Sequence, residues 1–298
     1  MSSKNSIDRK PKHYVLVHGA CYGAWLWYKL KPRLESAGHK VTVLDLAASG
    51  TNMKKIEDVD TFSQYTEPLL QLMATIPPNK KVVLVGHSLG GLNIALAMEK
   101  FPEKVAVGVF VTAIIPDIEH KPSYVLEKLL ESTLATNLLD SEFSKSGNKT
   151  IVVFGPKFLS NKLNQASTIE VITYYNLVHI LLAEKVACFF FFSYVNKNKD
   201  WILQDIELAK TLIRPGSLFI EDLSQQKNFS IQGYGSVPLA FIVSTEDQEI
   251  PLNFQHWMIQ NAGINVEVLE IKGADHMLMI SKPQELCDSL LQIATKYA

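Results

Sequence analysis

The feature that most constrains this chain is a serine set between glycines, directly after a buried strand and directly before a helix. Residues 81–85 contain three valines and a leucine and predict a buried strand. Residues 86–90 fit the pattern Gly-x-Ser-x-Gly, and a helix-forming run follows from Leu92 to Phe101. This context predicts a nucleophile elbow, a strained turn that lifts the Ser88 hydroxyl clear of the sheet. The pentapeptide by itself occurs often by chance, and the alternative is a glycine-rich turn.

Apolar runs elsewhere alternate with helical segments, which predicts a mostly parallel sheet with helices on both faces. Between Ile114 and Gly235 this alternation is lost, and the sequence shows helical runs and loops. We therefore expect one α/β domain over 13–298, preceded by a polar arm over 1–12. A cap over about 114–235 is expected between its two sequence segments. Strands are predicted at 13–17, 41–46, 105–111, 239–243 and 266–271, and further helices at 25–36, 61–76, 253–261 and 283–297.

Composition and charge exclude several classes of protein. Apolar residues make up 47% of the 298 residues and charged residues 20%, which is typical of a globular chain. A net charge of −1 gives no reason to expect nucleic acid or a membrane as a partner. Cys21, Cys188 and Cys287 are too few and too scattered for a disulfide framework or a zinc cage. The N-terminus lacks the apolar core of a signal peptide. The few cysteines and this N-terminus together predict a reducing, cytoplasmic location.

A serine nucleophile needs a general base, and the base needs a carboxylate that orients it. Where an elbow serves a parallel sheet, the acid follows a late strand and the histidine follows the last strand. The strand at 239–243 is followed by Asp247, and the strand at 266–271 is followed by His276. We therefore predict Ser88, Asp247 and His276 as a catalytic triad.

Both partners of the serine have rivals in the sequence. Glu246 adjoins Asp247 but should point the opposite way. Asp275 adjoins His276, and a neighbour in sequence cannot easily reach back to the same imidazole. The other seven histidines are expected in surface or structural roles. His87 precedes Ser88, and the turn is expected to send its side chain away from the hydroxyl.

Acyl transfer also needs two hydrogen-bond donors for the oxyanion. One is predicted to be the backbone N–H of Leu89, the residue after the nucleophile. The second is expected from the loop after the first strand, where we assign it to the N–H of Ala20. The alternative is that His18-Gly19 forms only a turn.

Four motifs together resemble one family. They are His18-Gly-Ala-Cys-Tyr-Gly-Ala-Trp25, Leu44-Asp-Leu-Ala-Ala-Ser-Gly50, Val85-Gly-His-Ser-Leu-Gly-Gly91 and Gly273-Ala-Asp-His276. They are similar to the plant methylesterase branch of the α/β-hydrolase superfamily, of the methyl salicylate esterase type, which is related to the hydroxynitrile lyases. The resemblance covers residues 13 to about 164 and 205–298.

The resemblance implies a soluble carboxylesterase without metal or organic cofactor. Its expected partners are a small-molecule ester, such as methyl salicylate, methyl jasmonate or methyl indole-acetate, and the free acid product, with a possible homodimer. It implies Ala20, Leu89, Leu129, Leu138 and Met277 as substrate-binding residues. Esterases that bind small aromatic acids typically have Tyr and Trp where Leu129 and Leu138 align. The pocket is therefore expected to be more aliphatic, unless these leucines only pack the cap.

Two other functions remain open on the same fold. Hydroxynitrile lyases of this branch typically carry Thr, Glu and Lys where this chain has Gly19, His87 and Met277, which favours the esterase. The lysine matters because its charge stabilises departing cyanide. A non-catalytic protein that binds a small hormone is the second alternative.

Residues 168–204 form an atypical insertion relative to the family. About thirty extra residues, including Phe189 to Phe192, separate two stretches that resemble neighbouring parts of the family's cap. A membrane anchor is disfavoured because Glu184-Lys185 interrupts the apolar run. An elaboration of the cap and a translated intron remain. The lack of helix caps and of a consistent amphipathic period favours the intron.

Overall fold

The structure is a computed structural model of the whole chain, and it describes residues 10–133, 138–165 and 204–298. The first nine residues of the predicted polar arm, and all but the last residue of the predicted insertion over 168–204, lie outside the described residues.

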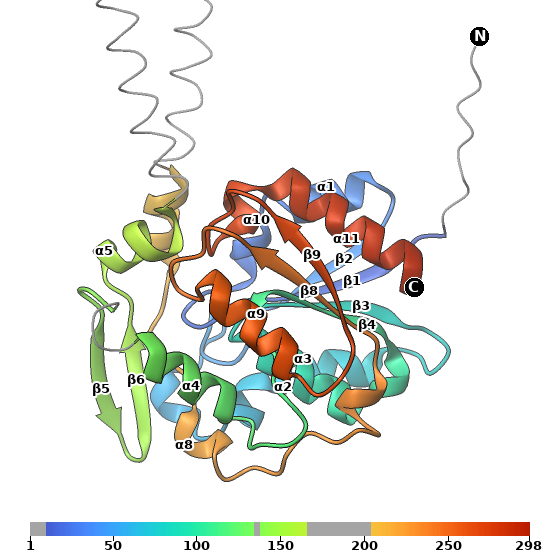
Figure 1. Cartoon of the computed structure of the whole chain (residues 1–298). Coiled ribbons are helices and arrows are strands. Elements are labelled where there is room, and N and C mark those ends of the chain that lie inside the picture. Colours follow the sequence, from blue (N-terminus) through green and yellow to red (C-terminus); the bar gives the residue numbers. More distant parts are fainter. Residues whose placement is uncertain (1–9, 134–137, 166–203) are drawn as a thin grey trace, which may run out of the picture.

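A six-stranded sheet, parallel in every pairing, forms the centre of the molecule (Figure 1). The predicted strands and their parallel arrangement are confirmed, and the order across the sheet is β2-β1-β3-β4-β8-β9. β3 and β4 lie at its middle and are buried almost throughout, as their unbroken apolar runs require. The bounds are β1 His13–Val17, β2 Lys40–Val43, β3 Val82–Ser88, β4 Val105–Ala113, β8 Leu239–Ser244 and β9 Val266–Ile271.

The second strand ends three residues earlier than predicted. Asp45 turns the chain out of the sheet because its carboxylate accepts hydrogen bonds from the Ala24 amide at 2.7 Å and from the Thr51 amide at 2.9 Å. Gly50 lies so close to this carboxylate that a Cβ there would be 2.0 Å from Asp45 Oδ1. The motif over 44–50 therefore builds a tight loop rather than a longer strand.

Helices cover both faces of the sheet, as predicted (Figure 1). One face packs against α2, α3 and α9, and the other against α1, α10 and α11, which gives two separate hydrophobic clusters. Helices of one face are α2 Phe62–Thr75, α3 Gly90–Lys100 and α9 Leu252–Asn261; those of the other are α1 Lys31–Ser36, α10 Leu278–Ser281 and α11 Pro283–Tyr297.

The single helix predicted over 25–36 is wrong. A 3-10 turn over Ala24–Trp27 is followed by a separate helix, α1, that begins at Lys31. Pro32 lies in the first turn of α1. Backbone N–H groups in a first turn have no acceptor within the helix, so the missing N–H of proline costs no hydrogen bond there. In the middle of one long helix the same proline would have broken the hydrogen-bond ladder.

Residues 114–235, which we call the cap, lie between β4 and β8 in the sequence. They contain a three-stranded antiparallel sheet, β5-β6-β7, that the sequence did not predict. These strands lack an apolar pattern that would predict them, because β5 is mostly exposed and polar and β7 has only two residues. Elements of the cap are α4 Tyr124–Thr133, β5 Glu142–Ser146, β6 Lys149–Val153, α5 Pro156–Phe158, a π-helical turn Leu159–Leu163, a helix over 204–212, β7 Gly216–Ser217, α8 Ile220–Leu223 and a 3-10 turn Tyr234–Ser236.

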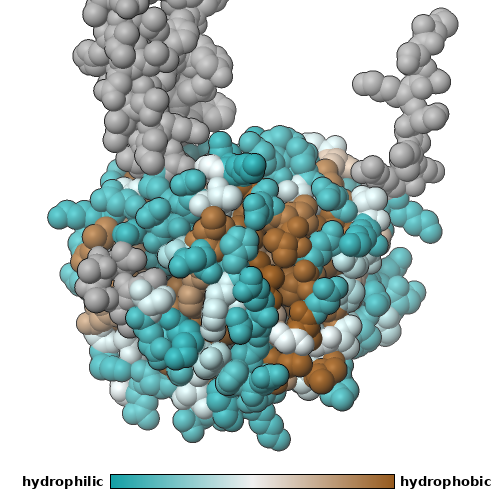
Figure 2. All heavy atoms as spheres, viewed as in Figure 1, coloured by the Kyte–Doolittle hydropathy of each residue, from teal (hydrophilic) through white to brown (hydrophobic). Residues whose placement is uncertain are grey.

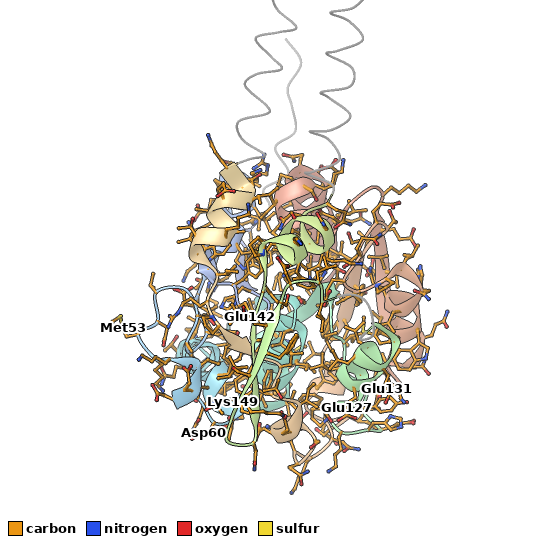
Figure 3. All side chains as sticks on the ribbon, turned by 90° about the vertical axis from the view of Figure 1, so that its left-hand side faces the viewer. Met53, Asp60, Glu127, Glu131, Glu142 and Lys149 are labelled. Carbon is orange, nitrogen blue, oxygen red and sulfur yellow. The ribbon has the colours of Figure 1, made fainter. Side chains whose placement is uncertain are left out.

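Buried polar contacts tie the cap to the central domain. Lys149, labelled at the hairpin β5–β6 in Figure 3, donates to the carbonyl oxygens of Ile56 at 2.6 Å and Val59 at 2.5 Å. Arg214 Nη1 donates to the Gly50 carbonyl at 3.1 Å. These contacts fix the cap over the carboxyl ends of the central strands, where the parallel sheet is expected to carry its site.

The surface of the face drawn in Figure 2 is mostly hydrophilic, with hydrophobic residues gathered near its centre. The edge strand β9 lies in that region, and its Val268 is 41% exposed. In the part of the chain that the structure describes, we find no helix with the length and apolarity that a membrane crossing requires.

Close backbone contacts surround the turn between β3 and α3. A Cβ at Gly86 would lie 2.6 Å from the carbonyl oxygen of Gly90, and a Cβ at Gly90 would lie 2.7 Å from the carbonyl oxygens of Val17 and His18. Backbone atoms cannot move aside as a flexible side chain can. Glycine is therefore required at both positions of the Gly-x-Ser-x-Gly pattern.

We predict that Gly86→Ala lowers the free energy of unfolding by about 1–3 kcal/mol, the usual cost of overpacking. The control is Gly235→Ala, because a Cβ there meets nothing closer than 3.3 Å. Its effect should be smaller than that of Gly86→Ala, because a contact of 3.3 Å needs a shift of only a few tenths of an ångström in the neighbour. Urea unfolding of both variants measures the difference, and equal stabilities would contradict the role given to this packing.

Candidate active site

Ser88 is the last residue of β3 and is held in a left-handed conformation with φ of +53°. Such a backbone is strained for a residue with a side chain and is typical of functional sites. The register between β3 and β4 shifts between His87 and Ser88, where the chain turns out of the sheet. Gly19 lies against this turn, since a Cβ on it would be 2.8 Å from Ser88 Cβ. The strand, the strained turn and the helix α3 together have the form of the predicted elbow.

Asp247 and His276 meet at the carboxyl end of the sheet. They do so because β8 and β9 are parallel neighbours, and the loops that follow them leave the sheet at the same end. Asp247 Oδ2 accepts a hydrogen bond from His276 Nδ1 at 2.7 Å and another from the Thr112 hydroxyl. Its Oδ1 accepts the backbone amides of Glu249 at 2.7 Å and Ile250 at 2.8 Å. Four donors therefore hold this carboxyl group in one orientation. The pairing leaves His276 Nε2 as the atom that can take up a proton.

The sequence rivals of Asp247 point elsewhere. Glu246 is exposed. Asp275 is buried and accepts hydrogen bonds from the Met277 amide at 3.1 Å and the Ser281 hydroxyl at 2.7 Å. The carboxylate that bonds the imidazole is that of Asp247.

The electrostatics of His276 favour its protonated form. Burial by itself lowers the pKa of this imidazole, but the charge and hydrogen bond of Asp247 outweigh burial, and Glu249 and Asp275 add to them. The net result is a pKa above the ordinary value of 6.5. A base with a raised pKa holds an abstracted proton well, which general base catalysis needs.

One cavity brings Ser88 and His276 together at the carboxyl end of the sheet, beneath the cap. It encloses about 570 Å³ of empty space, part of it open to solvent. No hydrogen bond links the Ser88 hydroxyl to His276 among the described residues. Apart from these two, the lining consists of Gly19, Ala20, Tyr22, His87, Leu89, Ile114, Leu126, Leu129, Leu130, Phe154, Leu163, Leu218, Glu249 and Ile250.

The two backbone amides predicted to hold an oxyanion belong to residues that line this cavity, Ala20 and Leu89. Within the described ranges, neither amide is used in a turn, loop or cap hydrogen bond. His18 fixes the loop that carries Ala20, because its Nδ1 is 2.7 Å from the Gly19 carbonyl and its Nε2 accepts the Leu46 amide at 3.1 Å. Burial lowers the pKa of His18 to about 4, so this ring is neutral and acts as a strut.

The substrate-binding residues implied by the family are only partly brought together. Ala20, Leu89 and Leu129 line the cavity. Met277 does not, because it is fully buried in the hydrophobic cluster beneath α10 and α11. Leu138 does not line it either and packs, partly buried, against the same cluster. Met277 and Leu138 are therefore not part of the cavity lining, Leu138 takes the packing role left open for it, and a contact of either residue with substrate stays a prediction.

Sequence reasoning missed two polar residues of the cavity, His87 and Glu249. His87 Nε2 is 2.9 Å from the His276 carbonyl oxygen and must donate to it, which leaves Nδ1 as an acceptor. This Nδ1 is buried and has no partner among the described residues. Burial, with the nearby charge of His276, lowers the pKa of His87, so its ring is neutral. The only signal for either residue was its position beside a predicted triad member.

Within the described part of the chain, no group of three or more His, Cys, Asp or Glu side chains is arranged to hold a metal ion. Cys21 and Cys287 are buried free thiols. Ser88, His276 and Asp247 are of the residue types that can act as a nucleophile, a base and an orienting carboxylate.

Comparison with known proteins extends the resemblance seen in four short motifs. A family model described as alpha/beta hydrolase fold matches residues 12–283. Salicylic acid-binding protein 2 of Nicotiana tabacum is 48% identical over 293 residues, which cover 97% of this chain and 99% of that protein. Methylesterase 1 of Arabidopsis thaliana is 46% identical, covering 98% and 99%. The crystal structure of polyneuridine aldehyde esterase superposes with a TM-score of 0.81 at 45% identity, covering 96% of this chain and 100% of that one.

We predict that kcat/KM for an ester rises with pH through an apparent pKa above 6.5. The imidazole of His276 must be neutral to accept a proton, and its pKa is raised by Asp247, so protonation persists to a higher pH than in free histidine. Asp247→Asn should lower this pKa and reduce kcat about 10⁴-fold. A pH profile of both proteins is the measurement, and a native midpoint at or below 6.5 would contradict the arrangement.

Proposed function

Since this chain belongs to the alpha/beta hydrolase family, in its plant methylesterase branch, we propose that it hydrolyses methyl esters of small plant hormones or metabolites through an acyl-enzyme on Ser88. The chain is a carboxylic ester hydrolase by family. Its partners are the small-molecule ester and the free acid that hydrolysis releases. The homodimer and the cytoplasmic location expected from the sequence remain predictions.

In the first half of the reaction, Ser88 Oγ attacks the carbonyl carbon of the ester while its proton passes to His276 Nε2. Asp247 holds the imidazole by its Nδ1–H at 2.7 Å and stabilises the imidazolium that forms. The amides of Ala20 and Leu89 stabilise the oxyanion of the tetrahedral intermediate. His276 then returns the proton to the methoxy oxygen, and methanol leaves.

In the second half, a water molecule enters and His276 takes one of its protons. The resulting hydroxide attacks the acyl carbon, and a second tetrahedral intermediate forms in the same oxyanion site. Ser88 then leaves with the proton from His276, and the free acid is released. Each group returns to its starting protonation state.

The observation that carries this proposal is the convergence of three separate loops on one cavity. Ser88 comes from the strained end of β3, Asp247 follows β8, and His276 follows β9. Most of the remaining lining is aliphatic or aromatic, and the narrow space favours a small, largely apolar acyl group. Relatives named methylesterase and salicylic acid-binding protein support methyl esters and small carboxylic acids as the substrate and product classes.

We predict that Ser88→Ala reduces turnover of p-nitrophenyl acetate and of a panel of methyl esters by about 10⁴- to 10⁶-fold. Loss of one oxygen at the end of β3 removes the nucleophile but little packing, so the fold should persist in circular dichroism. A variant that keeps more than a few per cent of the native rate would contradict Ser88 as the nucleophile. Tight binding of a free acid by the native protein without ester turnover would favour the non-catalytic binding protein instead.

We also predict that the protein releases no cyanide from mandelonitrile or acetone cyanohydrin. Threonine in place of Gly19 would press against Ser88, because even a Cβ there would be 2.8 Å from Ser88 Cβ. Met277 is uncharged and lies outside the cavity, so no ammonium is supplied at that position to stabilise cyanide. Rapid cleavage of either compound in a cyanide assay would favour the lyase over the esterase.

A further inference from the structure

A second carboxyl group, that of Glu249, faces the cavity beside the proposed triad. Glu249 lines the cavity together with Ser88 and His276. Its position is fixed by the turn after β8, in which the Glu249 amide donates to Asp247 Oδ1 at 2.7 Å. The mechanism above uses Asp247 from this turn and leaves Glu249 without a role.

The carboxyl group of Glu249 makes no hydrogen bond or ion pair with any residue in the described ranges. Among the residues that the structure describes, no lysine or arginine lines the cavity, and its walls are largely aliphatic and aromatic. The charged groups that act on Glu249 are His276 and Lys162, which attract its negative charge, and Asp247, which repels it. Lys162 is itself engaged in another interaction and does not line the cavity.

These surroundings make the ionised form of Glu249 costly without a ligand. Its side chain is partly exposed to solvent, and this partial burial raises its pKa from 4.5 to about 7, with Asp247 adding to the shift and His276 and Lys162 opposing it. A carboxylate that is unpaired in an apolar site gains most from a cation that binds beside it. A neutral acyl group offers no such gain.

We propose that Glu249 is a specificity residue that binds a positively charged amine on the acyl part of the substrate. This inference rests on the proposed function, in which the leaving group is methanol, so the amine has to belong to the acyl part. The substrate class is then a small methyl ester with an apolar body and a protonated or quaternary amine. His87 Nδ1, a neutral acceptor in the same lining, adds no competing positive charge.

The test uses two esters of the same shape, methyl 4-(trimethylammonio)butanoate and methyl 5,5-dimethylhexanoate, which differ by one positive charge. We expect the ratio of kcat/KM for the charged over the neutral ester to fall about tenfold or more in Glu249→Gln. The matched control is Glu246→Gln, because Glu246 is exposed and does not line the cavity. This control should leave the ratio unchanged, and a ratio unaffected by Glu249→Gln would overturn the proposal.

The same ratio should rise with pH in the native protein. Glu249 gains its charge as the pH passes about 7, and the trimethylammonium group does not titrate. Protonation of His276 affects both esters alike and cancels in the ratio, although the two groups titrate as a coupled pair. We expect the rise between pH 6 and pH 8 to disappear in Glu249→Gln. A ratio that is flat with pH in the native protein would overturn the proposal.

Binding to the inactive Ser88→Ala variant separates this inference from the proposed function. Calorimetry on Ser88→Ala should give about tenfold or more tighter binding of the charged ester, and Ser88→Ala with Glu249→Gln should lose that preference. Equal affinities for the two esters would overturn the role of Glu249 even if both are hydrolysed. If the native protein hydrolyses neither ester but Ser88→Ala still binds the charged ester more tightly, the proposed esterase activity would be refuted. The proposed cation-binding role of Glu249 would then still stand.

Discussion

The close approach of backbone to backbone at the end of β3 is the constraint on which the rest of the site depends. Gly90 at the start of α3 lies directly on the carbonyl oxygens of Val17 and His18, and Gly86 lies on the carbonyl of Gly90. This packing brings the N-terminus of α3 and the loop after β1 to the same point. The strained turn at Ser88 and the amides of Ala20 and Leu89 are thereby placed around one small volume.

The charges around this volume are unequally satisfied. Asp247 has four hydrogen-bond donors and is held in one orientation, whereas Glu249, two residues later, has none among the described residues. The first carboxylate holds the base in one orientation for every substrate. The second carboxyl group can bind a charged group of the ligand. In this proposal, Asp247 therefore serves the reaction and Glu249 serves the selection of substrate.

The cap contributes selectivity rather than reacting atoms. Leu129, Phe154, Leu163 and Leu218 of the cap form much of the apolar lining, and the proposed reacting groups all come from the central sheet. Buried contacts such as that of Lys149 with the Ile56 and Val59 carbonyls hold the cap in place. Changes in the cap can therefore alter the acyl group that fits while leaving the triad geometry unchanged.

The sequence by itself determined the parallel sheet, the elbow at Ser88 and the candidates Asp247 and His276. Each of these depends on local patterns. Buried strands are continuous apolar runs, and the carboxyl ends of parallel strands lie at the same end of the sheet. Only the tertiary structure decided which side chains enter the cavity. It placed His87 and Glu249 in the lining, excluded Leu138 and Met277, and formed the sheet of the cap. Those outcomes depend on loop conformation and on packing between segments distant in sequence, for which no local period exists.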